Sequence, residues 1–257
     1  MHSSQKADIV RLLNEMPGSF ANLPGEIFSS GLSALTPGDF YLAGLNPMAG
    51  SRYPTLRDHI ADWRLDSFSA FLHQCWNKTC WNVDCYGLQH SLQCTHERGT
   101  DRHQMAVRRL MERARPGFDL ARLFATNAVF ARSASASSFQ KENGLSMAQA
   151  FDVCWPLHKY FLSIVRPSII LCLGYQQGGS AYSLFSRKAA GGLVTPVSSF
   201  TAGRKFPSFK STEMTFDING GRLSCLIVGI RHPSYVPDAA DTSEFAELVT
   251  RHLRAEQ

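Results

Sequence analysis

The stretch R-P-S-I-I-L-C-L-G, residues Arg166–Gly174, decides the fold class of this 257-residue chain. Its short apolar run is bounded by Pro167 and Gly174, which predicts a buried strand over Ile169–Leu173. A helical pattern precedes the strand, with Ser146 as its cap and Pro167 as its stop signal. A helix followed by a short apolar strand is typical of α/β proteins.

The same alternation of helical and strand patterns continues on both sides of this stretch. It predicts a three-layer α/β/α fold with a central, mainly parallel sheet of four or five strands. We expect one domain over residues 1–257, with a helical insertion rich in Cys and Trp at about residues 60–100. The other predicted strands are Phe40–Leu45, Leu123–Val129 and Leu223–Gly229, and the other predicted helices are Ala7–Glu15, Gln104–Ala114 and a C-terminal helix capped by Asp241 and Glu244.

Composition and charge indicate the broad class of protein to which this chain belongs. Hydrophobic residues make up 44% and charged residues 18%, as in a soluble globular enzyme. The apolar runs are too short for a membrane helix and no signal peptide is recognisable, so we expect a cytoplasmic monomer without a membrane partner. The net charge is +5, and no acidic residue lies between Asp152 and Glu213. Such clustering favours either a polyanion-binding face or a solvated basic surface.

Two short strings place uncharged hydrogen-bonding side chains at predicted strand ends. They are G-L-N-P-M-A-G at Gly44–Gly50 and G-I-R-H-P-S-Y at Gly229–Tyr235. The carboxyl ends of parallel strands meet at the edge of a sheet where ligands bind in open α/β folds. We therefore expect Asn46 and His232 to lie close together in a cleft.

Four segments, in order, resemble motifs of the uracil-DNA glycosylase superfamily, in blocks scattered over about Asp39–Tyr235. The resemblance is to a divergent, bacterial-type member, and it implies that a flipped pyrimidine is cut from DNA by hydrolysis of its N-glycosidic bond, leaving an abasic site. The segments are G-L-N-P at Gly44–Pro47, A-T-N-A-V-F at Ala125–Phe130, the strand Arg166–Gly174, and H-P-S at His232–Ser234.

The resemblance also implies roles for three side chains. Asn46 would position the attacking water, His232 would stabilise the departing base, and Asn127 would bind the edge of the pyrimidine. An amide is not a useful base at neutral pH, so we expect Asn46 to orient the water rather than to remove its proton. Each residue also has a structural interpretation: a turn at Asn46, a capped loop at His232, and a buried tie between strand and loop at Asn127.

Further DNA contacts are implied around these motifs. Tyr235 and Val236 follow the H-P-S string, where the family carries its intercalating side chain. Tyr53 is the candidate aromatic residue for stacking on the base. The other candidate contacts are Ser234 and, as phosphate-binding cations, Arg52, Arg132 and Arg231, for which surface charge is the structural alternative.

The pocket departs from the family pattern at Met48. Efficient uracil enzymes have a tyrosine in this place that closes off the C5 position of the pyrimidine. A flexible methionine leaves room for a C5-modified base, such as hydroxymethylated or glucosylated cytosine in phage DNA. The favoured role is therefore anti-phage defence, while uracil repair stays open. The alternative from another class is a non-catalytic DNA- or nucleotide-binding module that keeps the fold.

No cofactor is expected. One local cluster of cysteines could bind zinc or an iron–sulfur cluster, but its spacing matches neither the usual zinc pairs nor the cluster pattern of the family. Packing within the helical insertion is the favoured interpretation. The cysteines of this cluster are Cys75, Cys80, Cys85 and Cys94.

Overall fold

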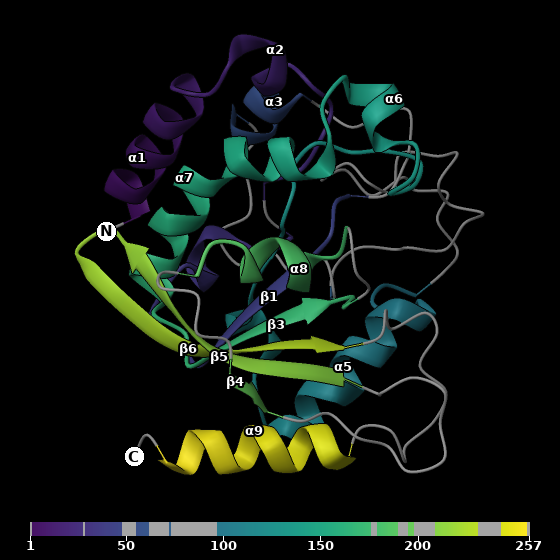
Figure 1. Ribbon diagram of the computed structural model, residues 1–257, viewed down its shortest axis with the longest axis vertical. Coiled ribbons are helices and arrows are strands. Elements are labelled where there is room, and N and C mark those ends of the chain that lie inside the picture. The colour runs from purple at the N-terminus through teal and green to yellow at the C-terminus, as the bar shows by residue number, and fades with distance from the viewer. Residues whose placement is uncertain are drawn as a thin grey trace.

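The computed structural model describes residues 2–27, 29–47, 55–61, 72, 97–175, 179–189, 195–197, 209–230 and 243–255. Its centre is a six-stranded sheet with the strand order β2-β1-β3-β6-β5-β4 (Figure 1). The first four strands in this order are parallel, and β5 and β4 continue the sheet in antiparallel pairing. The strands are β1 (Phe40–Gly44), β2 (Phe124–Asn127), β3 (Ile169–Leu173), β4 (Thr195–Val197), β5 (Phe209–Ile218) and β6 (Gly221–Ile230).

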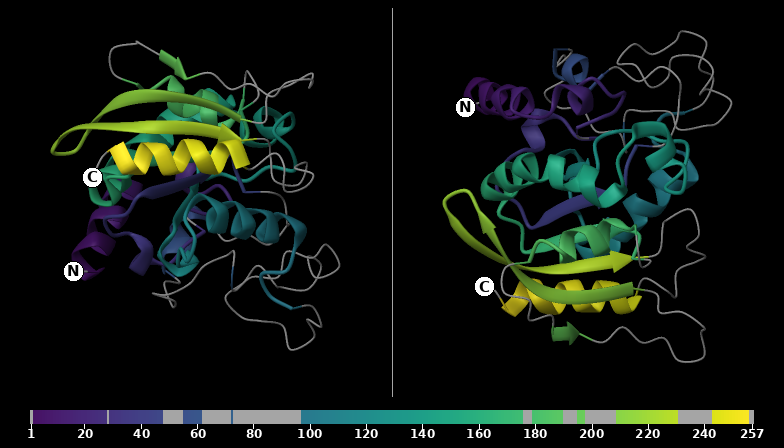
Figure 2. Two further views of the ribbon diagram at one scale, coloured as in Figure 1. Left: turned by 90° about the horizontal axis from the view of Figure 1, so that it is seen from below. Right: turned by 45° about the horizontal axis from the view of Figure 1, so that its top comes forward.

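Helices cover both faces of the sheet (Figure 2). On one face α7 (Met147–Val165) and α8 (Ala181–Ser186) contact the strands, and α1 (His2–Asn14) packs on α7. The other face is covered by α5 (Arg102–Ala114) and α9 (Ser243–Ala255). The predicted three-layer, mainly parallel fold is confirmed. Shorter helical segments are α2 (Gly18–Ala21), η1 (Leu32–Ala34), α3 (Leu56–Ala61), η2 (Leu120–Arg122) and α6 (Phe139–Asn143).

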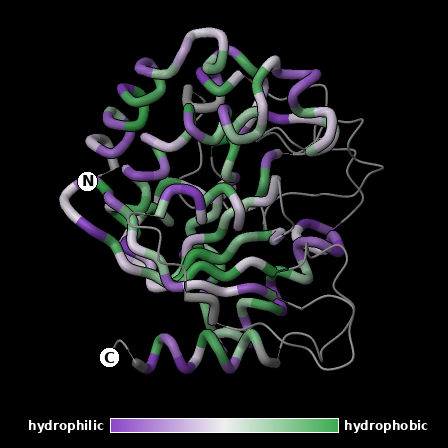
Figure 3. Tube along the Cα trace, in the orientation of Figure 1, coloured by the Kyte–Doolittle hydropathy of each residue, from purple (hydrophilic) through white to green (hydrophobic). Residues whose placement is uncertain are grey.

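The strands alternate between the two apolar clusters because successive side chains point to opposite faces. In β1, Tyr41 packs with the α7 side, whereas Phe40 and Leu42 pack with the α5 and α9 side. Both faces of the parallel strands are buried, so these strands are almost wholly apolar. Figure 3 shows this concentration of apolar residues in the sheet.

Local signals in the sequence explain how the central strand β3 begins. Ser146 caps α7 by accepting a hydrogen bond from the Gln149 backbone, and the Gln149 side chain bonds the Ser146 backbone in return. The helix ends at Val165, and the next residue, Arg166, has a φ of 46° that turns the chain just before Pro167. The predicted helix cap and the strand Ile169–Leu173 are both confirmed.

Other parts of the sheet differ from the sequence prediction. The last strand is longer than expected and pairs with β5. β5 was not predicted from the sequence, although its positions alternate between buried and partly exposed, as in a half-buried strand. The three-residue β4 brings the number of strands to six. Most of the predicted insertion at 60–100 lies outside the described residues. Within the described ranges, no helix is long and apolar enough to cross a membrane.

Candidate functional site at the carboxyl edge of the sheet

The four parallel strands end at a common edge. Gly44 at the end of β1 is in register with Asn127 at the end of β2, and Leu173 of β3 is in register with Ile230 of β6. One strand, β3, separates β1 from β6, so their ends lie roughly 10 Å apart at the usual strand spacing. The G-L-N-P string therefore leaves the sheet close to the point where the chain continues toward His232, which itself lies outside the described residues.

Backbone hydrogen bonds hold the two loops that follow β1 and β2 against each other. The Ala128 N–H donates to the Gly44 carbonyl at 2.8 Å, and the Val129 N–H donates to the Leu45 carbonyl at 2.9 Å. Farther along, the Ser133 N–H donates to the Pro47 carbonyl at 3.3 Å. These backbone hydrogen bonds hold the two loops together beyond the ends of the strands and bring Asn46 next to Ser133.

Asn46 is half-buried, and its carboxamide nitrogen is occupied. Nδ2 donates to Ser133 Oγ at 2.8 Å and to the Pro47 carbonyl at 3.3 Å. The structure shows no hydrogen bond between Asn46 Oδ1 and another described residue. The carboxamide nitrogen of Asn46 is thus held between Ser133 and Pro47 at the edge of the sheet, and its water-positioning role stays a prediction.

Asn127 has a buried side chain that lies across Gly44. Its exposed fraction is 9%, and a Cβ added at Gly44 would overlap Asn127 Oδ1. Among the described residues, no hydrogen-bond partner of the Asn127 carboxamide is present. The Asn127 carboxamide is not among the fully buried polar side-chain atoms that lack a partner in the described part of the chain. Asn127 thus lies at the end of β2 beside Gly44, and its base-binding role stays a prediction.

A buried histidine fixes the backbone directly after Asn127. His158 on α7 bonds the Ala128 carbonyl through Nε2 at 2.9 Å and the Tyr41 hydroxyl through Nδ1 at 2.8 Å. Because a carbonyl can only accept, Nε2 carries the proton and Nδ1 accepts from Tyr41. Burial lowers the pKa of His158 to about 4, which keeps the ring neutral. Sequence reasoning missed this residue, whose only signal is a histidine on an apolar helix.

A buried carboxyl lies behind the same loop. The backbone N–H of Glu26 donates to the Phe130 carbonyl at 3.0 Å, and Glu26 Oε2 accepts from the Ser29 hydroxyl at 3.2 Å. Burial raises the pKa of Glu26 to about 7, although the hydrogen bond from Ser29 acts in the opposite direction. Glu26 was also missed, because it stands in a Gly- and Pro-rich connection that has no periodic pattern.

Arg132 is the only predicted DNA-contacting residue within the described ranges. It is half-buried, and its backbone N–H donates to the Pro24 carbonyl at 3.0 Å. Its charge is one cause, after the hydrogen bond from Ser138, that lowers the pKa of the Glu142 carboxyl. The candidates that lie outside the described residues are Met48, Arg52, Tyr53, Arg231, His232, Ser234, Tyr235, Val236 and the cysteines Cys75, Cys80, Cys85 and Cys94.

Metal binding finds no support in the part of the chain that the structure describes. No group of three or more His, Cys, Asp or Glu residues is placed there to hold an ion. Cys154, Cys172 and Cys225, the described cysteines, are buried and form no disulfide bond.

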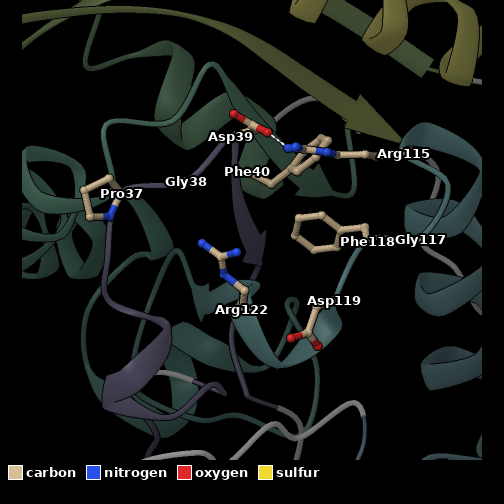
Figure 4. A pocket seen from close by; sticks show the side chains of 9 residues that line it. All are labelled: Pro37, Gly38, Asp39, Phe40, Arg115, Gly117, Phe118, Asp119 and Arg122. Atoms are coloured by element: carbon tan, nitrogen blue, oxygen red, sulfur yellow. Dashed lines mark ion pairs between the residues drawn. The ribbon is translucent and has the colours of Figure 1, made fainter.

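A cavity of about 320 Å³ lies at the opposite edge of the sheet, where β1 begins (Figure 4). Asp39 and Arg115 form an ion pair on its wall, and the guanidinium of Arg122 points into it. Phe40 and Phe118 pack edge to face beside them, with ring centroids 5.3 Å apart. This cavity is separated from Asn46 and Asn127 by the length of the strands, so it is not part of the carboxyl-edge site.

Comparison of the chain with protein-family models, with curated proteins and with solved structures finds no match. The resemblance to the uracil-DNA glycosylase superfamily therefore rests on the four sequence segments.

Proposed function

We propose that this protein is a monofunctional DNA glycosylase, and that the carboxyl edge of the sheet is its active site. The observation that carries the proposal is the pair of carboxamides at neighbouring strand ends. Neither Asn46 Oδ1 nor the Asn127 carboxamide has a hydrogen bond to another described residue. Two amides in these states suit a ligand with several hydrogen-bonding groups.

The proposed reaction needs a positioned water and a stabilised leaving group. The water oxygen forms a bond to the sugar C1′, the C1′–N1 bond breaks, and its electron pair leaves with the base. The proton that the water loses is taken up by the departing base, so the products are a neutral abasic sugar and a neutral base. Oδ1 of Asn46 accepts a hydrogen bond from the water and so orients its lone pair toward C1′. Asn127 binds the pyrimidine edge through its amide, which offers one donor group and one acceptor. His232 donates a hydrogen bond to the departing base.

The test uses duplexes that carry one uracil, hydroxymethylcytosine or glucosylated cytosine. After single-turnover incubation, heating in alkali cleaves each abasic site and reveals excision. We expect cleavage of a C5-modified substrate, and no covalent adduct after borohydride treatment because the matched motifs contain no lysine. Tight DNA binding without excision of any base would instead support the non-catalytic DNA-binding module.

Substrate choice is tested at Met48. If this residue borders the C5 position, Met48→Tyr should reduce excision of the modified base much more than excision of uracil, because the rigid ring overlaps a C5 substituent. The ratio of the two rates, compared between variant and wild type, cancels any general loss of activity. Equal losses on both substrates, or a wild type that excises uracil alone, would favour a uracil repair enzyme.

A further inference from the structure

We propose that Ser133 is a positioning residue, whose buried hydroxyl holds the Asn46 carboxamide with its oxygen toward the ligand. The catalytic consequence rests on the proposed function, whereas the orientation itself does not. Ser133 lies 87 positions from Asn46 in the sequence and is fully buried. Nothing in the four sequence motifs indicates it.

The direction of each hydrogen bond around Ser133 follows from its partners. Ser133 Oγ lies 2.8 Å from the Ser135 carbonyl, which can only accept, so the hydroxyl proton is directed there. Ser133 Oγ must then accept from Asn46, and the atom 2.8 Å away is the amide nitrogen. The Pro47 carbonyl, 3.3 Å from the same nitrogen, requires the same assignment. Two independent acceptors therefore fix which end of the carboxamide is the donor.

The loop that carries Ser133 is itself held in place. The Ser133 N–H donates to the Pro47 carbonyl, and this bond ties the loop to the G-L-N-P segment. The Glu142 carboxylate accepts from the Ala134 N–H at 3.1 Å and from the Ser138 hydroxyl at 2.5 Å. These contacts hold the loop that places Ser133 Oγ beside Asn46 Nδ2 and the Ser135 carbonyl.

One chemical consequence follows for the ligand. With its nitrogen engaged twice, Asn46 can offer only Oδ1, so the group that it binds must be a hydrogen-bond donor, as a water molecule is. A carboxylate has no donor, so in an Asn46→Asp variant Ser133 would have to give its proton to the new carboxylate and lose its bond to Ser135. Ser133 is thus matched to an asparagine.

The orientation can be tested without any substrate. In 15N-labelled protein, we expect the Asn46 side-chain amide protons to exchange slowly with solvent. Ser133→Ala should speed this exchange roughly 10-fold or more, since one hydrogen bond is lost, and Ser133→Thr, which keeps the hydroxyl, should preserve it. Ser137→Ala is the matched control, because Ser137 is exposed in the same loop and its hydroxyl contacts Ser135 Oγ. Equal exchange in wild type and Ser133→Ala would overturn the proposal.

The catalytic consequence is tested by single-turnover excision. Ser133→Ala should lower the rate roughly 10-fold with little change in DNA affinity, and Ser133→Thr should restore most of it. If Ser133→Ala alters the amide exchange but leaves excision unchanged, the positioning role is wrong although the orientation is right. A wild type that excises nothing refutes the proposed function, and the exchange measurement still decides the role of Ser133 in orienting Asn46.

Discussion

The two edges of the sheet carry polar groups of different kinds. At the carboxyl edge, Asn46 and Asn127 are uncharged and lie in fixed or buried positions, and the buried Glu26 and His158 lie behind them. At the amino edge, the charges of Asp39 and Arg115 are paired and partly exposed, with 36% and 51% of their side chains open to solvent.

This difference indicates which edge of the sheet carries polar groups that lower the stability of the fold. An exposed ion pair costs little and contributes little. Buried polar groups cost free energy unless they are bonded, and the displaced pKa values of Glu26 and His158 are costs of this kind. Groups with displaced pKa values are candidates for functional sites. The comparison therefore favours the carboxyl edge as the candidate site over the cavity at the opposite edge.

The largest effect on stability is expected from Glu26→Gln. Because burial raises the pKa of Glu26 from 4.5 to about 7, its contribution to stability is lost as the pH rises through that range. Because burial lowers the pKa of His158 from 6.5 to about 4, its contribution is lost as the pH falls through that range. Each group changes the free energy of unfolding by roughly 3 kcal/mol across its own pH range. In the wild type the two changes oppose each other.

Replacing the Glu26 carboxyl by an amide should leave only the pH dependence of stability that comes from His158. Between about pH 6.5 and about pH 4.5, the free energy of unfolding of Glu26→Gln in urea should fall by roughly 2 kcal/mol, whereas that of the wild type should change much less. Asp217→Asn is the control, because it makes the same carboxyl-to-amide change at an exposed position. Parallel curves for Glu26→Gln and wild type would show that these two groups do not set the pH response.

A smaller effect on stability is expected at Gly44, whose backbone lies against the Asn127 side chain. Gly44→Ala would place a methyl group in overlap with Asn127 Oδ1, so the amide must move. We expect roughly 1–3 kcal/mol of destabilisation, typical of overpacking, together with slower excision. Gly38→Ala, just before the other end of β1, is the matched control, since the nearest atom is 3.8 Å away. Equal tolerance of the two alanines in urea unfolding and in excision would mean that Asn127 is not held as described.

The smallest effect is expected at the amino edge. Arg115→Gln removes the ion pair with Asp39, but both side chains are substantially exposed. The free energy of unfolding should fall by less than about 1 kcal/mol, and by still less at high salt. Excision should be unchanged. A loss of several kcal/mol in urea unfolding, or of activity, would remove the contrast between the two edges.

Much of the fold could be predicted because its signals are local. The apolar run Ile169–Leu173 between Pro167 and Gly174, and the cap at Ser146, depend on neighbouring residues only. The placement of Asn46 and Asn127 at one edge follows from a general rule for parallel sheets. The strand β5 was not predicted, although the alternation of its buried and partly exposed positions is the pattern of a half-buried strand.

The supporting residues of the site could not be predicted, because their partners are distant in the sequence. Tyr41 and His158 are 117 positions apart, and Asn46 and Ser133 are 87 positions apart. A serine in a Ser- and Ala-rich stretch, or a histidine in an apolar helix, has the same local pattern whether or not it supports a site. Only the register of β1 with β2 and the packing of α7 select these pairs.

The most direct test compares one residue from each edge in the same assay. Single-turnover excision of the preferred modified base is measured for wild type, Asn46→Ala and Arg122→Gln, with DNA affinity measured in parallel. Asn46→Ala should lower the excision rate roughly 10²–10³-fold with little change in affinity, while Arg122→Gln should match wild type. A large loss for Arg122→Gln with normal excision by Asn46→Ala would contradict the account and place the chemistry at the opposite edge of the sheet.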